Sequence, residues 1–105
     1  MRKIINIIVI TFFVSGVFAQ GLTDVKICID PGHGGHESDD RHILATDFWE
    51  SESNLTKALE LDTLLSDLGA NVLLIRYAND DNVLDDPSLS QRVAIANAFD
   101  ADFFH

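Results

Sequence analysis

The sequence has little cysteine, little basic charge and no long uninterrupted apolar run. Cys28 is the single cysteine, so no disulfide can form within the chain, and the disulfide framework of many small secreted domains is excluded. Seven Lys and Arg accompany 17 Asp and Glu in 105 residues, a formal net charge of −10. Because a protein that holds a phosphate backbone needs clustered basic charge, this balance excludes an electrostatic nucleic-acid binder. The length allows one small domain at most.

The amino terminus has the layout of a secretory signal peptide. Arg2 and Lys3 make a basic start, residues 4–14 are almost uniformly apolar, and a Val-Phe-Ala site follows. We predict a signal peptide over residues 1–19 and an exported domain over residues 20–105. A transmembrane anchor is the alternative, but it needs about 20 apolar residues in a row. Loss of the two basic residues leaves five basic and 17 acidic side chains, a net charge of −12, which suits a soluble protein of the periplasm or the outside of the cell.

Strand and helix patterns alternate after residue 20. Residues 25–30 are rich in β-branched side chains and end at a Pro-Gly pair, which predicts a strand. Residues 51–68 carry leucine and alanine at three- and four-residue spacing, which predicts an amphipathic helix with Gly69 at its end. Residues 71–76 form a nearly continuous apolar run, typical of a strand covered on both faces of a parallel sheet. These segments make a βαβ unit with a right-handed crossover.

The last part of the chain repeats this alternation. Ser88 and Gln91 have the spacing of a capping box, which predicts that a helix begins there after an acidic loop. The residues that this helix is expected to bury are Leu89, Val93, Ile95 or Ala96, and Phe99. A third strand is expected to begin within residues 101–105. We therefore predict an α/β fold with an open, mainly parallel sheet flanked by helices in three layers, truncated after the start of the third strand.

The loop after the first strand is the most informative stretch, with the sequence DPGHGG over residues 30–35. It places His33 at the carboxyl end of a parallel strand, where open α/β sheets bind their ligands. It lacks the glycine spacing, the Lys and the Ser/Thr of a phosphate-binding loop. An exposed turn histidine is the alternative interpretation, although a plain turn needs fewer special residues. The polar segment that continues to Trp49 is too long for a passive connector.

Four blocks of the sequence resemble the zinc-dependent N-acetylmuramoyl-L-alanine amidases of the amidase-3 type, a family of cell-wall hydrolases. In order along the chain they are KICIDPGHGG, WESESNLTKALEL, GANVLLIR and LSQRVAIANAFDADFF. The resemblance runs from about Val25 to the last residue. It implies a Zn²⁺ cofactor, peptidoglycan as the substrate, and hydrolysis of the amide bond between N-acetylmuramic acid and L-alanine.

The resemblance also implies metal ligands. His33 matches the first zinc ligand of the family, and a Glu at the start of the first helix is the second. Glu50 fits this position best because Leu55 and Ala58 follow it at the offsets of the family, and Glu52 is the alternative. A histidine nitrogen and a carboxylate oxygen are ordinary zinc ligands, and a catalytic zinc takes three protein ligands plus water. Taken alone, Glu50 is a favourable acidic residue near a helix N-terminus.

The remaining catalytic groups of the family are expected beyond His105. These are a third zinc ligand in a Ser-Ile-His-x-Asn stretch and a catalytic Glu, so no catalytic residue is assigned within the chain. His105 precedes that stretch and is not equated with the ligand. The alternative function is a truncated, catalytically inactive fragment that at best binds metal or peptidoglycan. An unrelated secreted α/β binding module would require four coincidental blocks.

Other polar residues are interpreted as scaffold. Four further residues match recurring positions of the family, and the resemblance implies no role in bond breaking for them: Arg76, Arg92, Ala96 and Asn97. We expect them to anchor loops or cap backbone groups. His36 and His42 lie in the polar segment, where a solvated histidine is a more frequent finding than a metal ligand.

Overall fold

The computed structural model describes residues 21–36, 41–80 and 86–105, and the predicted signal peptide therefore lies outside the described residues. The elements, in chain order, are β1 (Lys26–Ile29), β2 (His42–Ile43), β3 (Phe48–Trp49), α1 (Glu50–Asp67), β4 (Asn71–Leu74), α2 (Leu89–Phe99) and β5 (Phe103–Phe104). Within the described part of the chain, no helix combines the length and the apolar character that crossing a bilayer requires.

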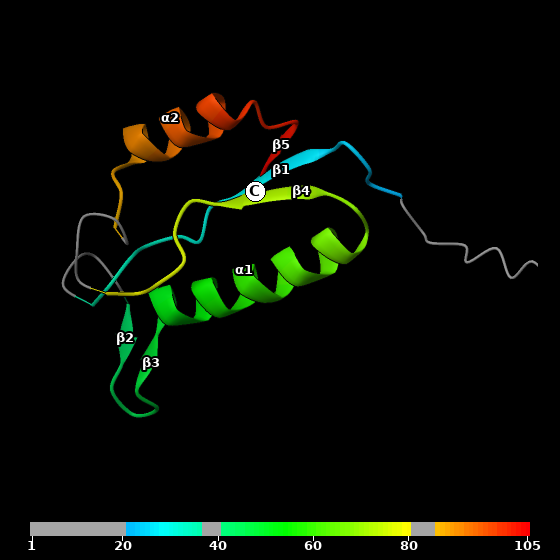
Figure 1. Ribbon diagram of the computed structural model, residues 1–105. Helices are drawn as coiled ribbons and strands as arrows, with labels where there is room; N and C mark the ends of the chain where they lie inside the picture. Colours follow the sequence, from blue (N-terminus) through cyan, green and yellow to red (C-terminus); the bar gives the residue numbers. More distant parts are fainter. Residues whose placement is uncertain (1–20, 37–40, 81–85) are drawn as a thin grey trace, which may run out of the picture.

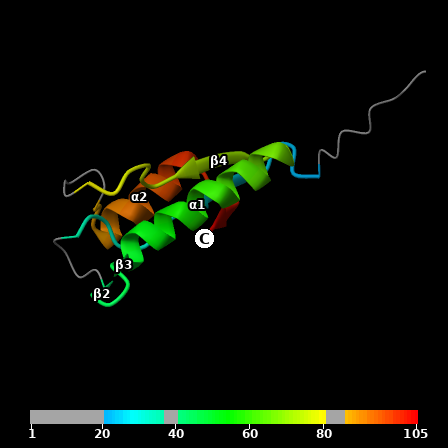
Figure 2. The ribbon, with the colours of Figure 1, turned by 90° about the horizontal axis from the view of Figure 1, so that it is seen from below.

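Strand β1 is the centre of a parallel sheet with the order β4-β1-β5. It pairs with β4 from Lys26 opposite Asn71 to Ile29 opposite Leu74, and its other edge pairs with β5. Helix α1 covers one face of this sheet and α2 covers the other (Figures 1 and 2), which confirms the predicted three-layer α/β fold. The chain passes to one side of β1 through α1 and returns to the other side through α2. The carboxyl end of β1 is therefore a topological switch point, the usual place for a ligand in such sheets.

The core lies on both faces of β1. Ile27 and Ile29 pack with Ala58 of α1, whereas Cys28 packs with Ala96 of α2. This alternation follows from the two-residue period of a strand. Because both faces are covered, the strand has the continuous apolar sequence of a buried parallel strand. The Cys28 side chain is completely buried, and burial raises the pKa of its thiol, with the nearby carboxylate of Asp30 as the second cause.

Helix α1 confirms the predicted amphipathic helix and begins one residue earlier than expected, at Glu50. Its apolar stripe is wider than the surface that the sheet offers, so Leu61 and Leu65 pack against the core while Leu64 stays 63 % exposed. The chain leaves the helix through Gly69 at φ +92°, a left-handed conformation that glycine adopts without the strain of a Cβ atom.

Helix α2 confirms the predicted capping box. The Gln91 amide donates to the Ser88 hydroxyl, and the Ser88 amide donates to the Gln91 side chain. The predicted buried face is partly wrong, because Leu89 and Val93 are 82 % and 55 % exposed. Arg92 is buried instead, because its guanidinium donates to the backbone of the loop after β1. The side of α2 that carries Arg92 therefore faces the sheet.

A short antiparallel hairpin occupies part of the segment that the sequence marked only as polar. Strands β2 and β3 pair His42 with Trp49 and Ile43 with Phe48. Two-residue strands carry no detectable period, which explains why the sequence did not predict them. The hairpin leads directly into α1, and the Glu50 amide donates to the Arg41 carbonyl at 3.1 Å.

Candidate metal site

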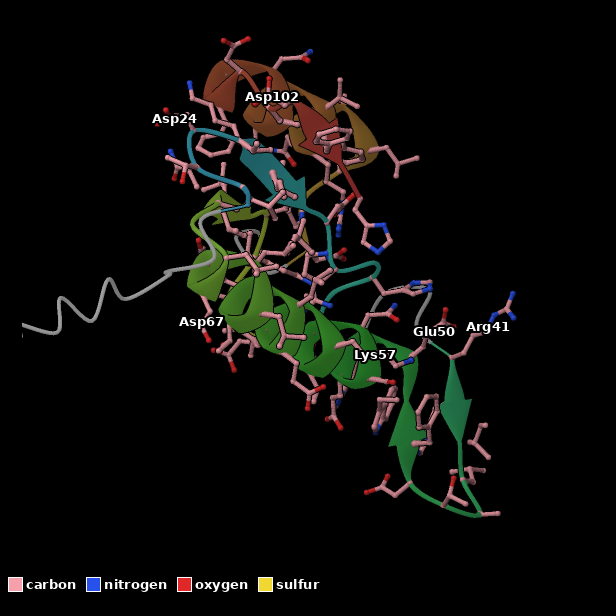
Figure 3. The ribbon with its side chains drawn as sticks, turned by 90° about the vertical axis from the view of Figure 1, so that its right-hand side faces the viewer. Asp24, Arg41, Glu50, Lys57, Asp67 and Asp102 are labelled. Atoms are coloured by element: carbon pink, nitrogen blue, oxygen red, sulfur yellow. The ribbon has the colours of Figure 1, made fainter. Side chains whose placement is uncertain are left out.

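The two predicted metal ligands lie together at the carboxyl end of the sheet. His33 belongs to the loop after β1, and Glu50 is the first residue of α1. His33 Nε2 lies 3.5 Å from Glu50 Oε1, and the side chains are 29 % and 36 % exposed. Arg41 Nε lies 3.8 Å from Glu50 Oε2, the other oxygen of the same carboxylate. Figure 3 shows Glu50 and Arg41 where the hairpin meets the start of α1.

The alternative ligand, Glu52, is engaged elsewhere. Its Oε1 lies 2.7 Å from His36 Nε2. Residues two positions apart on a helix point to different sides, which explains why Glu50 and Glu52 meet different histidines. The structure therefore brings Glu50, and not Glu52, to His33.

The separation within the His33–Glu50 pair fits a shared zinc ion. Zinc lies about 2.05 Å from a histidine nitrogen and about 2.1 Å from a carboxylate oxygen, so two tetrahedral ligands stand about 3.4 Å apart. The observed Nε2 to Oε1 distance of 3.5 Å agrees with this value. Among the described residues, no group of three or more His, Cys, Asp or Glu side chains could hold a metal ion, so His33 and Glu50 stand as a pair of candidate ligands.

Two buried arginines hold the backbone of the His33 loop. Arg92 of α2 donates to the Asp30 carboxylate at 2.5 Å and to the carbonyls of Pro31 and His33 at 3.0 and 2.9 Å. Arg76, which follows β4, also donates to the Pro31 carbonyl, at 3.0 Å. This confirms the expectation that both arginines anchor a loop. The anchoring holds His33 at φ +60°, a left-handed backbone conformation that is uncommon for a residue with a side chain.

Three further polar residues join this loop to α1 and to the chain after β4, and the sequence reasoning missed them. Ser51 donates to the Gly35 carbonyl, Asn54 donates to the Gly32 carbonyl, and the Asn79 side chain accepts from the Gly35 amide. Ser51 and Asn54 share one face of α1 with the buried Ala58. Polar residues on the apolar face of a helix were the signal that could have identified them.

The other two described histidines of the polar segment stack on Trp49. The His36 ring lies 3.8 Å from the Trp49 ring and the His42 ring lies 3.9 Å from it, with interplanar angles of 11° and 8°. His42 Nε2 also lies 2.9 Å from Asp47 Oδ1. Both side chains keep solvent-exposed surface, at 36 % for His36 and 23 % for His42, and the structure adds that each imidazole has one face packed on Trp49.

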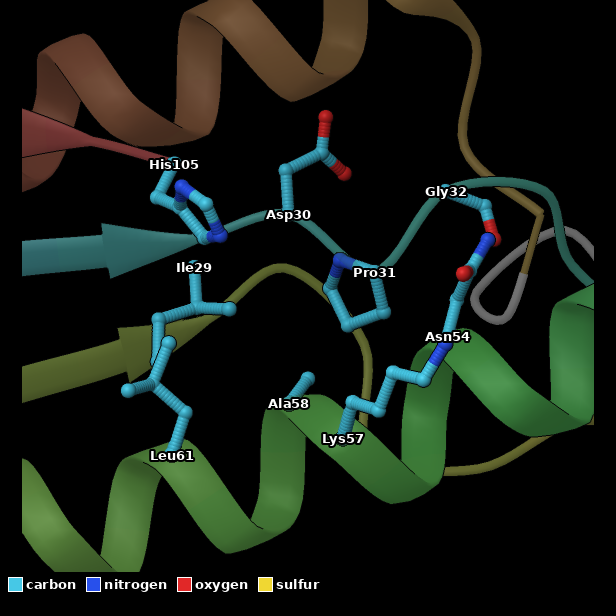
Figure 4. A pocket seen from close by; sticks show the side chains of 9 residues that line it. All are labelled: Ile29, Asp30, Pro31, Gly32, Asn54, Lys57, Ala58, Leu61 and His105. Atoms are coloured by element: carbon cyan, nitrogen blue, oxygen red, sulfur yellow. The ribbon is translucent and has the colours of Figure 1, made fainter.

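A pocket of about 220 Å³ opens beside the site, between the carboxyl end of β1 and α1 (Figure 4). Pro31, Asn54, Lys57 and His105 contribute to its lining. His105 continues the pairing of β5 with β1, since its amide donates to the Cys28 carbonyl at 2.9 Å and its carbonyl accepts from the Asp30 amide at 2.6 Å. Neither His33 nor Glu50 lines this pocket; His33 lines a second pocket, of about 420 Å³, together with Asp30 and Arg92.

The structure is an open parallel α/β domain with a histidine–carboxylate pair at its switch point, where domains of this class bind their ligands. The chain belongs to the N-acetylmuramoyl-L-alanine amidase family (Amidase_3), whose sequence model matches residues 27–104. This confirms the resemblance that the four sequence blocks indicated.

Two relatives agree with this assignment. The N-acetylmuramoyl-L-alanine amidase CwlM of Bacillus licheniformis is 38 % identical over 80 residues, which are 76 % of this chain and 29 % of that protein. The structure of the N-acetylmuramoyl-L-alanine amidase AmiC2 of Nostoc punctiforme is similar with a TM-score of 0.64 and 27 % identity, over 80 % of this chain and 43 % of that one. The chain thus spans less than half the length of either relative.

Proposed function

We propose that this chain takes part in zinc-dependent hydrolysis of the amide bond between N-acetylmuramic acid and L-alanine in bacterial peptidoglycan. The observation that supports this proposal most is the His33–Glu50 pair, whose donor atoms stand 3.5 Å apart at the switch point of an amidase-family fold. The two relatives are both named as amidases of this bond. We further propose residues 1–19 as a cleaved signal peptide, residues 20–105 as the amidase portion, and the cell envelope or the exterior as its location.

In this proposal, His33 Nε2 and Glu50 Oε1 hold the zinc ion. Neutral imidazole is the form that binds metal, so a metal ion at Nε2 would leave the ring proton of His33 on Nδ1. Arg41 Nε lies 3.8 Å from the second oxygen of Glu50, but its side chain is 85 % exposed, so this ion pair contributes little to fixing the carboxylate. When bound, zinc polarises a substrate carbonyl and lowers the pKa of water toward about 7. By resemblance to the family, the third ligand would belong to a Ser-Ile-His-x-Asn stretch after the position of His105, and the proton-accepting Glu would lie near the end of the catalytic domain.

A narrower function is binding of metal or peptidoglycan without hydrolysis. The number of candidate ligands favours this narrower function. The described residues bring together two candidate ligands, whereas a catalytic zinc takes three protein ligands. The two functions share the same metal pair and differ in whether the amide bond is broken.

A peptide-release assay tests the proposal. Purified peptidoglycan is incubated with the protein, and stem peptides with a new amino-terminal L-alanine are measured with zinc, with chelator, and after zinc is restored. In protein that also carries the third ligand and the catalytic Glu of the family, we expect zinc-dependent release that Glu50→Gln abolishes. Glu60→Gln is the matched control, since it makes the same change at an exposed position of the same helix. Release that persists in Glu50→Gln would contradict the site, and zinc binding without release would support the narrower function.

A further inference from the structure

One buried side chain connects the two segments that carry the candidate ligands. Arg76 is 2 % exposed and lies immediately beyond the end of β4. Its Nη2 donates to the Gly32 carbonyl at 3.0 Å, in the His33 loop, and to the Ser51 carbonyl at 2.9 Å, in the first turn of α1. Gly32 precedes His33 and Ser51 follows Glu50. Each acceptor is thus the direct chain neighbour of a candidate ligand.

Two neutral side chains complete this connection. Ser51 is fully buried, and its hydroxyl donates to the Gly35 carbonyl at 2.9 Å. The Asn79 amide group donates to the Ser51 hydroxyl at 3.0 Å, and its oxygen accepts from the Gly35 amide and from Arg76 Nη1, both at 3.1 Å. We call Arg76, Ser51 and Asn79 the loop clamp. Its hydrogen bonds link the His33 loop to the start of α1 at several points.

The chemistry of the clamp favours a geometric role. Arg76 is a planar fork that donates in fixed directions, so it sets the distance between its acceptors, which a flexible lysine ammonium does not. The network is satisfied, because no buried side-chain nitrogen or oxygen in the described part of the chain lacks a hydrogen-bond partner. A fully satisfied buried network is rigid. None of the clamp side chains belongs to the His33–Glu50 pair itself.

The ligand pair needs such support because its two members come from different segments. His33 has a left-handed backbone at φ +60°, and Glu50 begins a helix whose N-cap residue, Trp49, makes no side-chain capping hydrogen bond. Two ligand side chains bind one metal ion well only when they lie within about 0.5 Å of the required positions. Residues that contact the ligands usually provide that precision. The clamp acts on the backbone next to both ligands and so sets their separation.

We propose that the loop clamp is a positioning device for the metal site, in which Arg76, Ser51 and Asn79 hold His33 and Glu50 at the separation that one metal ion spans. This inference rests on the proposed function, since it takes His33 and Glu50 as the ligands. Its distinguishing consequence is a loss of metal affinity in protein that remains folded.

Titration of the full chain with Co²⁺ tests the clamp. Co²⁺ replaces Zn²⁺ in this titration because its binding can be followed by visible absorption. The variants are Arg76→Lys, Ser51→Ala and Asn79→Ala, each checked for folding by circular dichroism at the titration temperature. Thr63→Ala is the matched control for Ser51→Ala, because Thr63 also donates a hydroxyl to a carbonyl, but within α1 and toward Leu59. We expect clamp variants to bind Co²⁺ about 10- to 100-fold more weakly, and the control to bind it as the unchanged chain does.

The outcomes separate the clamp from the proposed function. If the unchanged chain does not bind Co²⁺, or if His33→Ala binds it equally well, the proposed site fails. If His33→Ala loses the metal while folded Arg76→Lys and Ser51→Ala keep it within twofold, the clamp is refuted, because a merely structural role lowers the melting temperature alone. Should Arg76→Lys fail to fold, Ser51→Ala and Asn79→Ala decide, and unchanged affinity in both overturns the proposal.

Discussion

Exchanging the carboxylate of Glu50 for an amide should remove most of the zinc affinity, whereas the same exchange at Glu52 should not. Glutamine keeps the length of the side chain and has a helix propensity close to that of glutamate, so Glu50→Gln preserves the start of α1. The variant loses the negative charge that faces His33 Nε2 at 3.5 Å. Glu52 carries the same charge two residues later, but it faces His36 at 2.7 Å.

The size of the difference follows from Coulomb's law. A carboxylate whose centre is about 2.8 Å from a divalent cation gains about 3 kcal/mol even at the dielectric constant of water, which corresponds to about a 100-fold change in Kd. A carboxylate about 10 Å away gains below about 1 kcal/mol before screening, and physiological salt reduces this to less than about a threefold change. Since Glu50 is 36 % exposed, the dielectric constant of water is the appropriate one for this Coulomb energy.

Calorimetric titration with Zn²⁺ at pH 7 measures these affinities, with circular dichroism to show that each variant is folded. We expect Glu50→Gln to bind about 100-fold more weakly and Glu52→Gln to stay within about threefold of the unchanged chain. A folded Glu50→Gln variant with unchanged affinity would refute the assignment. A large loss in Glu52→Gln instead would identify Glu52 as the ligand.

Three further predictions concern the framework around the site. Arg92→Ala should lower the free energy of unfolding by about 3 kcal/mol in urea denaturation, because the Asp30 carboxylate and the His33 carbonyl lose this donor, and a change below about 1 kcal/mol would contradict this. Gly69→Ala should lower it by about 1 to 2 kcal/mol, since φ is +92° there and a Cβ would lie 3.3 Å from the Thr23 hydroxyl, whereas unchanged stability would show that the turn relaxes. Cys28 is buried and should resist thiol reagents until the chain unfolds, and rapid labelling of the native protein would contradict this. Because burial raises the pKa of its thiol, the free energy of unfolding should fall as the pH rises above the ordinary thiol pKa. The unfolded chain, whose thiol pKa is lower, loses the proton first.

The strands and helices of the parallel sheet could be predicted from the sequence because their periods are local. The apolar run at β1, the leucine spacing of α1 and the Ser88–Gln91 capping box each specify an element without reference to the rest of the chain. His33 and Glu50 were chosen from the family resemblance, and the structure adds that they lie within 3.5 Å of each other.

What the sequence did not reveal depends on distant contacts. The burial of Arg92 in place of Leu89 follows from carbonyls more than fifty residues away in the chain. The link between Ser51 and Asn79 joins a helix to a later loop, and no local pattern marks either residue as a partner of the other. The stacking of His36 and His42 on Trp49 likewise needs the hairpin, whose strands are too short to carry a period.

The most direct measurement for the proposed metal site is an anomalous diffraction map, recorded at the zinc edge, of crystals grown with Zn²⁺. The account predicts a peak between His33 and Glu50, about 2.0 to 2.2 Å from Nε2 of the histidine and from Oε1 of the glutamate. A peak that avoids this pair, or zinc bound at Glu52 and His36 instead, would contradict it.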